Sequence, residues 1–207
     1  MKTRETNLLE LIHTDLADFK SVISRGGKNY YITFIDDCSR YTKVYLLKSK
    51  DETEHAFIKF KNEVENQLDR KIKRLRSDRG GEYGSNFLVK ICEENGLIHE
   101  NSPPYLPQSN GVAERKNKTL KEMMNAMLLS FGLSDDMWGE AILSACHILN
   151  RVPHKKIDKT SYEIWKGYPP NLSYFRVWGC LAKVGHPEFK RPTVSSRTYD
   201  CVFIGYA

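Results

Sequence analysis

Cysteine is scarce in this sequence and scattered along it. No Cys-x-x-Cys pair occurs and no two histidines stand three or four residues apart, so the sequence argues against a zinc module. The same scatter provides no cysteine–histidine pair of recognisable spacing, which argues against a cysteine protease. We expect buried, reduced thiols at the five positions, which are Cys38, Cys92, Cys146, Cys180 and Cys201.

Long apolar runs are also missing. No segment approaches the roughly 20 apolar residues that span a membrane. The opening Met-Lys-Thr-Arg-Glu does not have the pattern of a signal peptide. We therefore expect a soluble, intracellular protein in a reducing compartment, with no membrane partner.

The sequence does contain enough apolar side chains for a globular core, together with an excess of cations. With 207 residues, 40% of them hydrophobic and 28% charged, the chain is long enough for one full domain and part of a second. The formal net charge of +6 fits a polyanionic partner, but charge of this size also serves solubility alone. Composition leaves both interpretations open.

The first half of the chain carries the pattern of five strands. Residues 8–16 are apolar on both faces, as in a central strand. Residues 30–35 and 42–47 lie on either side of a short turn and are expected to form an antiparallel hairpin beside the first strand. A basic and apolar run from residue 71 leads into Asp78, and residues 97–100 form a last short strand.

Apolar residues at three- to four-residue spacing predict four helices. The first runs to about residue 68, has Asp51 or Thr53 as its N-cap and carries Glu65 on its solvent side. A short helix covers residues 86–94. A third helix begins at about residue 112, and a fourth begins near residue 134.

Two acidic residues stand where predicted elements begin or end. Asp78 closes a strand, at the edge where an open α/β sheet presents its ligands, and Glu114 falls in the first turn of the third helix. Thirty-five residues separate them, and a third acid, Asp15, lies in the first strand. Taken singly, such acids are usually turn formers or partners of the helix dipole. Their joint spacing, together with the flanking sequence, outweighs these interpretations.

The flanking sequence narrows the interpretation further. Its segments are His-Thr-Asp-Leu at 13–16, Phe-Ile-Asp-Asp-Cys-Ser-Arg at 34–40, Ser-Asp-Arg-Gly-Gly-Glu-Tyr at 77–83, Pro-Gln-Ser-Asn-Gly-Val-Ala-Glu-Arg-Lys-Asn at 107–117 and Trp-Gly-Glu-Ala at 138–141. With the spacing of the three acids, these segments resemble the integrase catalytic core of copia-type LTR retrotransposons over nearly the whole chain. Arg79 is a departure, because relatives commonly have asparagine there.

The resemblance implies an α/β fold of the ribonuclease-H-like class, with a mixed five-stranded sheet flanked by helices. It assigns residues 1–165 to the catalytic core and residues 170–207 to the incomplete start of a small SH3-like β module. It also implies that the chain is a fragment of a larger Pol polyprotein and lacks the zinc-binding module that precedes the core in relatives.

The resemblance further implies a metal-dependent enzyme that joins DNA. Two Mg²⁺ or Mn²⁺ ions per site would be held by carboxylates, since such ions prefer oxygen ligands. Asp78 would bridge the ions, Asp15 would ligate one or both, and Glu114 would hold the second. The implied reaction is polynucleotidyl transfer, in which the 3′-hydroxyl of element cDNA attacks a target-DNA phosphate, and such cores also nick DNA with water.

Three further acids compete for the site. Asp36 and Asp37 stand just before Ser39, a position that predicts a turn whose side chains bond local amides. Glu82 follows two glycines and is expected to serve loop geometry or DNA contact. We therefore leave all three outside the catalytic triad.

Cations flank both parts of the predicted site and favour phosphate binding, although a solvated helix face would carry the same charges. The helical period puts Glu114, Lys118 and Lys121 on one face. The residues predicted to contact nucleic acid are Arg76, Arg79, Tyr105, Gln108, Asn110, Arg115, Lys118 and Lys121.

Two other functions stay open from the sequence. One is a ribonuclease-H-like nuclease that only hydrolyses, and the other is a decayed or host-captured nucleic-acid-binding module without turnover. The partners that the resemblance implies are double-stranded DNA, as cDNA ends and as target, and further copies of the chain in a homo-oligomer on that DNA. The expected location is the nucleus or a cytoplasmic virus-like particle.

Overall fold

The computed structural model describes residues 4–19, 21–77, 86–101, 111–154, 157–190 and 193–206. Each run with a strand pattern in the first half of the chain forms a strand of one mixed sheet, which confirms the predicted architecture. The five strands are β1 (Leu11–Asp18), β2 (Tyr30–Asp36), β3 (Thr42–Leu47), β4 (Arg74–Ser77) and β5 (Ile98–Asn101).

The strand order is β3-β2-β1-β4-β5, so β1 lies in the middle of the sheet. It pairs antiparallel with β2 and parallel with β4, and β2 and β3 form the predicted antiparallel hairpin. A strand with neighbours on both edges and helices on both faces buries both sets of side chains. This explains why the first strand carries apolar residues on both of its faces.

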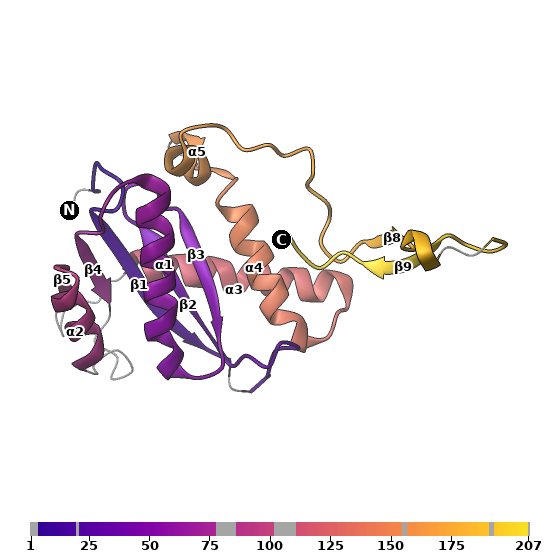
Figure 1. The fold of residues 1–207 in the computed structure, drawn as a ribbon, viewed down its shortest axis with the longest axis horizontal. Coiled ribbons are helices and arrows are strands. Elements are labelled where there is room, and N and C mark those ends of the chain that lie inside the picture. The colour runs from indigo at the N-terminus through magenta and orange to yellow at the C-terminus, as the bar shows by residue number, and fades with distance from the viewer. Residues whose placement is uncertain are drawn as a thin grey trace.

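Helices cover the two faces of the sheet unequally. Figure 1 shows α1 (Thr53–Leu68) in front of the sheet and α3 (Gly111–Phe131) behind it, with α4 (Trp138–Leu149) beside α3. The short α2 (Asn86–Glu94) lies by β4 and β5. On the α1 side the core contains Ile12, Ile32, Phe34, Phe57, Phe60 and Val64, and on the α3 side it contains Ala17, Tyr31, Leu120, Met124, Trp138 and Ile142.

Two details of α1 differ from the sequence prediction. Neither Asp51 nor Thr53 caps it, because a 3-10 turn, η1 (Lys50–Glu52), leads directly into the helix and no side chain bonds its first amides. Glu65 is 7% exposed rather than on the solvent side. Its carboxylate accepts hydrogen bonds from the backbone N–H of Ile72 and from Lys71, so the turn after α1 folds over it.

The C-terminal part of the chain forms small elements after a turn η3 (Asp135–Met137) and α4. They are β6 (Pro153–His154), β7 (Ile157–Thr160), α5 (Ser161–Lys166), β8 (Leu181–Gly185), η4 (Glu188–Lys190) and β9 (Thr198–Val202). The β8–β9 hairpin projects from the body in Figure 1.

Trp178 belongs to the buried cluster on the α3 side and so ties this part of the chain to that side of the core. It is 3% exposed, and its Nε1 donates a hydrogen bond to the carbonyl of Ile204 at 2.7 Å. The SH3-like identity of residues 170–207 and the boundary near residue 165 stay predictions. Within the described ranges, no helix has the length and apolar character needed to cross a membrane.

Candidate active site

Asp15 lies in the second half of β1, on the face of the sheet that α3 covers. Its backbone pairs with Thr33 of β2, which fixes the strand at this point. Asn117 of α3 donates a hydrogen bond from Nδ2 to Asp15 Oδ2 at 2.6 Å. Because Asn117 is 5% exposed and the acceptor is a carboxylate, this bond is of the stronger, charge-assisted kind. It holds the Asp15 side chain in one orientation.

Glu114 lies in the first turn of α3, as the sequence predicts, and its side chain is exposed. It stands one turn before Asn117, and residues three apart are neighbours on a helix surface. The bond from Asn117 to Asp15 therefore anchors the first turns of α3 beside β1. Two of the three predicted catalytic acids lie on elements that are joined directly.

The third acid, Asp78, lies outside the described residues, as do Arg79, Tyr105, Gln108 and Asn110. The strand that leads to it is described. β4 runs parallel to β1 with His13 opposite Arg76, and each of these two residues precedes a predicted catalytic aspartate by two positions. The roles assigned to the five residues outside the described ranges stay predictions.

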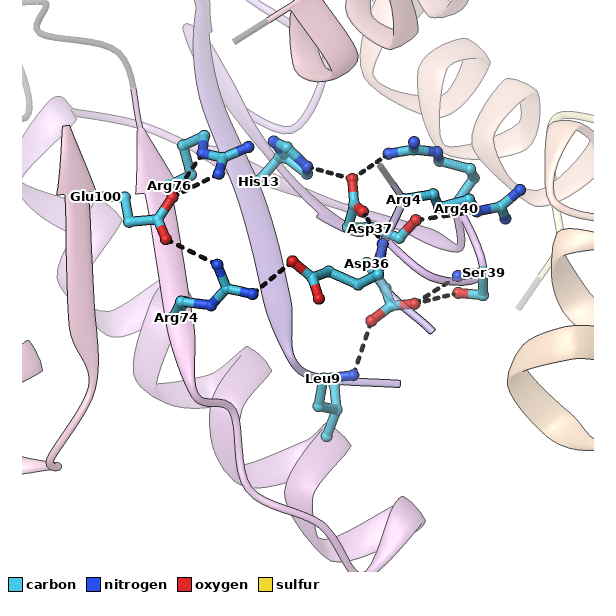
Figure 2. A network of polar contacts seen from close by, with 11 residues as sticks. Arg4, Leu9, His13, Asp36, Asp37, Ser39, Arg40, Arg74, Arg76 and Glu100 are labelled. Atoms are coloured by element: carbon cyan, nitrogen blue, oxygen red, sulfur yellow. Dashed lines mark hydrogen bonds and ion pairs between the residues drawn. The ribbon is translucent and has the colours of Figure 1, made fainter. Parts of the chain in front are cut away.

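Two arginines of β4 join this strand to β5 through Glu100. Arg76 is 9% exposed and donates from Nε to Glu100 at 2.9 Å, and Arg74 donates from Nη1 to the same carboxylate at 2.9 Å (Figure 2). Burial alone would raise the pKa of Glu100, but the two arginines outweigh it and lower that pKa. Arg76 thus has a protein partner in place, and its predicted contact with DNA stays a prediction.

His13 and Asp37 join β1 to the turn after β2, as Figure 2 shows. His13 Nε2 lies 2.7 Å from Asp37 Oδ1, and Arg40 donates to the same oxygen at 2.6 Å. Burial lowers the pKa of His13 in spite of Asp37. Burial would raise the pKa of Asp37, but bonds from His13 and the Glu5 amide outweigh it, so the pKa is lowered. The two lowered pKa values favour a neutral His13 whose Nε2–H donates to an ionised Asp37.

Asp36 is a structural residue of the same turn. It is 1% exposed and accepts hydrogen bonds from the Leu9 amide at 2.8 Å and from both the amide and the hydroxyl of Ser39 at 2.7 Å. Burial raises its pKa, although these bonds oppose the shift. Asp36 thus bonds the local amide of Ser39, as predicted for this turn, whereas Asp37 bonds the distant His13 and the Glu5 amide. That neither acid holds a metal stays a prediction.

The predicted cations on α3 lie at or near the surface. Arg115 and Lys118 are exposed, and Lys121 is partly buried with its Nζ 5.6 Å from the centre of the Phe19 ring. A helix face that presents exposed cations close to Glu114 is compatible with phosphate contact. The contact itself stays a prediction.

The sequence prediction missed Asn117. The residue belongs to the buried stripe of α3, four positions after Ala113 and three before Leu120. A polar side chain on an apolar stripe needs a partner inside the protein. That signal was present in the sequence, but it does not say which strand supplies the partner.

The donor chemistry of this part of the molecule fits a divalent cation that prefers oxygen. Asp15 and Glu114 supply carboxylates, and the side-chain oxygen of Asn117 is buried without a hydrogen-bond partner among the described residues. In those same ranges no group of three or more His, Cys, Asp or Glu gathers as a metal cluster. The predicted triad, however, includes Asp78, which they leave out.

Comparison with known proteins agrees with this arrangement. Residues 7–107 match the family model of the integrase core domain. The chain is 40% identical over 204 residues to the retrovirus-related Pol polyprotein from transposon TNT 1-94 of Nicotiana tabacum. This match covers 98% of the chain but only 15% of the polyprotein, so the chain spans a small part of that relative.

Solved retroviral structures share this fold. A chain of the simian T-cell lymphotropic virus intasome, solved in complex with PP2A regulatory subunit B56 gamma, aligns with a TM-score of 0.64 at 20% identity, covering 95% of this chain and 68% of that one. The HTLV-2 integrase catalytic core domain in complex with magnesium aligns with a TM-score of 0.56 at 20% identity, covering 75% and 95%. The chain belongs to the integrase core family of retrotransposon Pol polyproteins.

Proposed function

We propose that this chain joins the 3′ ends of element cDNA to target DNA, and also nicks DNA, with Mg²⁺ or Mn²⁺ as its cofactor. The 2.6 Å bond from Asn117 to Asp15 carries the proposal. It ties the helix of Glu114 to the strand of Asp15 in a chain of the integrase core family.

Asp15, Asp78 and Glu114 would hold the metal ions, which would neutralise the charge that develops on the phosphate during transfer. The HTLV-2 core was solved with magnesium, and this supports the same cofactor here. The chain's own contribution is preorganisation. The pairing of β1 with β2 and β4 fixes the backbone of Asp15, and Asn117 fixes its side chain.

Double-stranded DNA is the proposed partner, as cDNA ends and as target. Arg115, Lys118 and Lys121 lie on α3 close to Glu114, where they would neutralise phosphates on either side of the reacting one. A homo-oligomer on DNA is supported by the simian virus chain, which is part of an intasome, and by the HTLV-2 core, which was solved in dimeric and trimeric forms. The proposed location is the nucleus or a cytoplasmic virus-like particle.

The test is incubation of the chain with a short labelled duplex, a target DNA and Mn²⁺. Joined products are expected, and both Asp15→Asn and Asp78→Asn should abolish joining and nicking while leaving DNA affinity nearly unchanged, because the cations that bind phosphates remain. Hydrolysis without joining would favour the nuclease alternative. A variant that keeps more than a small fraction of the activity would overturn the triad.

A further inference from the structure

The last residue of β4 is paired with β5, beyond the point where the pairing with β1 ends. The ladder to β1 ends at the pair His13 and Arg76, whereas the ladder to β5 continues to the pair Ser77 and Asn101. Ser77 is the residue directly before Asp78. A one-residue shift of a strand turns every side chain to the opposite face of the sheet. The place of the acid that follows β4 therefore depends on the register between β4 and β5.

Glu100 ties β5 to one face of β4. Its Oε1 accepts a hydrogen bond from Nη1 of Arg74 at 2.9 Å, and its Oε2 accepts from Nε of Arg76 at 2.9 Å. Arg74 and Arg76 are two positions apart and therefore lie on the same face of the strand. One carboxylate thus holds both arginines by charge-assisted bonds, as Figure 2 shows.

His99 ties β5 to the opposite face of β4. Its Nε2 lies 3.0 Å from Oγ of Ser77, which is fully buried. Adjacent residues of a strand point to opposite faces, so His99 and Glu100 reach β4 from the two sides of the sheet. The last two residues of β4 are therefore held from both faces by two consecutive residues of β5.

The position of these polar contacts distinguishes them from ordinary packing of the sheet. Between the two arginines of β4 lies Leu75, which is fully buried in the apolar cluster on the α1 side and needs no directed bond. Buried polar pairs cost desolvation that apolar pairs of similar volume avoid, so they are weak evidence for a role in stability alone. Directed contacts at the end of β4 instead fix its geometry immediately before Asp78.

We propose that Glu100 and His99 are positioning residues for Asp78. They fix the register and the final direction of β4, and so place the Asp78 carboxylate relative to Asp15 on β1. This inference rests on the proposed function, because it takes Asp78 as a metal ligand. We call Glu100 and His99 the β5 brace.

The test compares thermal melts of wild type, Glu100→Gln and His99→Leu in EDTA and over a Mn²⁺ series. Mn²⁺ should raise the melting temperature of wild type, because it binds the folded site. Glu100→Gln should raise the Mn²⁺ concentration at half-maximal response about tenfold, and His99→Leu should raise it less. Burial lowers the pKa of His99, so His99→Leu removes no charge at neutral pH. Its shift would therefore not come from lost attraction for the cation.

Glu65→Gln is the matched control, because Glu65 is also a carboxylate held by two cations. It is 7% exposed and accepts from Lys61 at 3.1 Å and from Lys71 at 2.8 Å, at the end of α1. This variant should lower the melting temperature in EDTA and leave the Mn²⁺ midpoint unchanged. High Mn²⁺ should recover joining in Glu100→Gln, since Asp78 remains, whereas Asp78→Asn should stay inactive.

Three results would overturn the proposal. Wild-type Mn²⁺ midpoints in both brace variants, with lower melting temperatures in EDTA, would reduce the contacts to a structural role. A shifted midpoint in Glu100→Gln alone would mean that the lost negative charge governs the response, and not the position of β4. Wild type that gains no melting temperature from Mn²⁺ would overturn the proposed metal site itself, and the brace with it.

Discussion

The two faces of the sheet differ in what they bury, although β1 contributes side chains to both. On the α1 side, Ile12 and Leu16 join a cluster built around Phe34. On the α3 side, His13 and Asp15 alternate with them and need polar partners. The two-residue period of a strand makes this division possible within one short segment.

The difference separates stability from function. The aromatic cluster under α1 is stabilised by packing that needs no particular partner atom, and Phe34 and Phe60 stack with ring centres 4.5 Å apart. On the α3 side, His13 and Asp15 depend on a few directed hydrogen bonds, and removal of one partner leaves a buried polar group unsatisfied. The first face should therefore respond to loss of volume, and the second to changes in charge, pH and ligand.

The largest effect is expected on the apolar face. Phe34→Ala should lower the free energy of unfolding by about 3–5 kcal/mol. Phe34 is 1% exposed, so its truncation opens a cavity inside the cluster on the α1 side. Urea denaturation measures the change. Ile58→Ala on α1, the helix that covers this face, is the control, because Ile58 is 37% exposed, and it should cost less than about 1 kcal/mol. Similar costs for both variants would contradict the comparison.

On the polar face, Asn117→Asp should replace a donor to Asp15 with a second carboxylate. Loss of the bond and the new repulsion should lower stability in EDTA by about 1–3 kcal/mol. Mn²⁺ should recover more stability in this variant than in wild type, because a cation that binds the folded site relieves the repulsion. Thermal melts with and without Mn²⁺ measure both effects.

Asn125→Asp provides the matched control for that experiment, because Asn125 is exposed on the same helix. It should change neither the melting temperature in EDTA nor the response to Mn²⁺. An identical response of the two variants would show that net charge, rather than the contact with Asp15, governs the effect.

A smaller effect is expected from pH. Burial lowers the pKa of His13 below its ordinary value of about 6.5. The unfolded chain then binds more protons than the folded protein, so the contribution of neutral His13 is complete above about pH 6.5 and is lost as the pH falls below it. Urea unfolding from pH 8 to pH 5 should show wild type losing more stability than His13→Gln. A pH-independent difference between the two proteins would contradict this assignment.

The smallest effect concerns the surface of α3. Replacement of Lys118 and Lys121 by alanine should weaken DNA binding and flatten its dependence on log salt by about 1–2 units, if each contacts one phosphate. Lys118→Ala alone should contribute more than Lys121→Ala, since Lys121 also contacts the Phe19 ring. Fluorescence anisotropy across a salt series measures the slope. An unchanged slope would mean that these lysines only solvate the helix, and Lys90→Ala serves as the control.

The fold could largely be predicted from the sequence because local patterns and their order are sufficient for it. The hairpin of residues 30–47 and the helix of residues 86–94 form where the patterns predict them. The sequence also placed Glu114 in the first turn of α3, where the structure has it. What failed was the solvent-side placement of Glu65, since period alone does not reveal that a later turn folds over a helix.

The sequence by itself determined the strands, the helices and the candidate acids, because hydrophobic period and residue spacing act over short distances along the chain. Only the tertiary structure decided which buried polar groups meet. Asn117 and Asp15 are far apart in sequence, and so are Asn150 and Thr42, yet each pair is joined by short hydrogen bonds. A buried polar residue must find a partner, but its identity depends on how strands and helices pack in three dimensions.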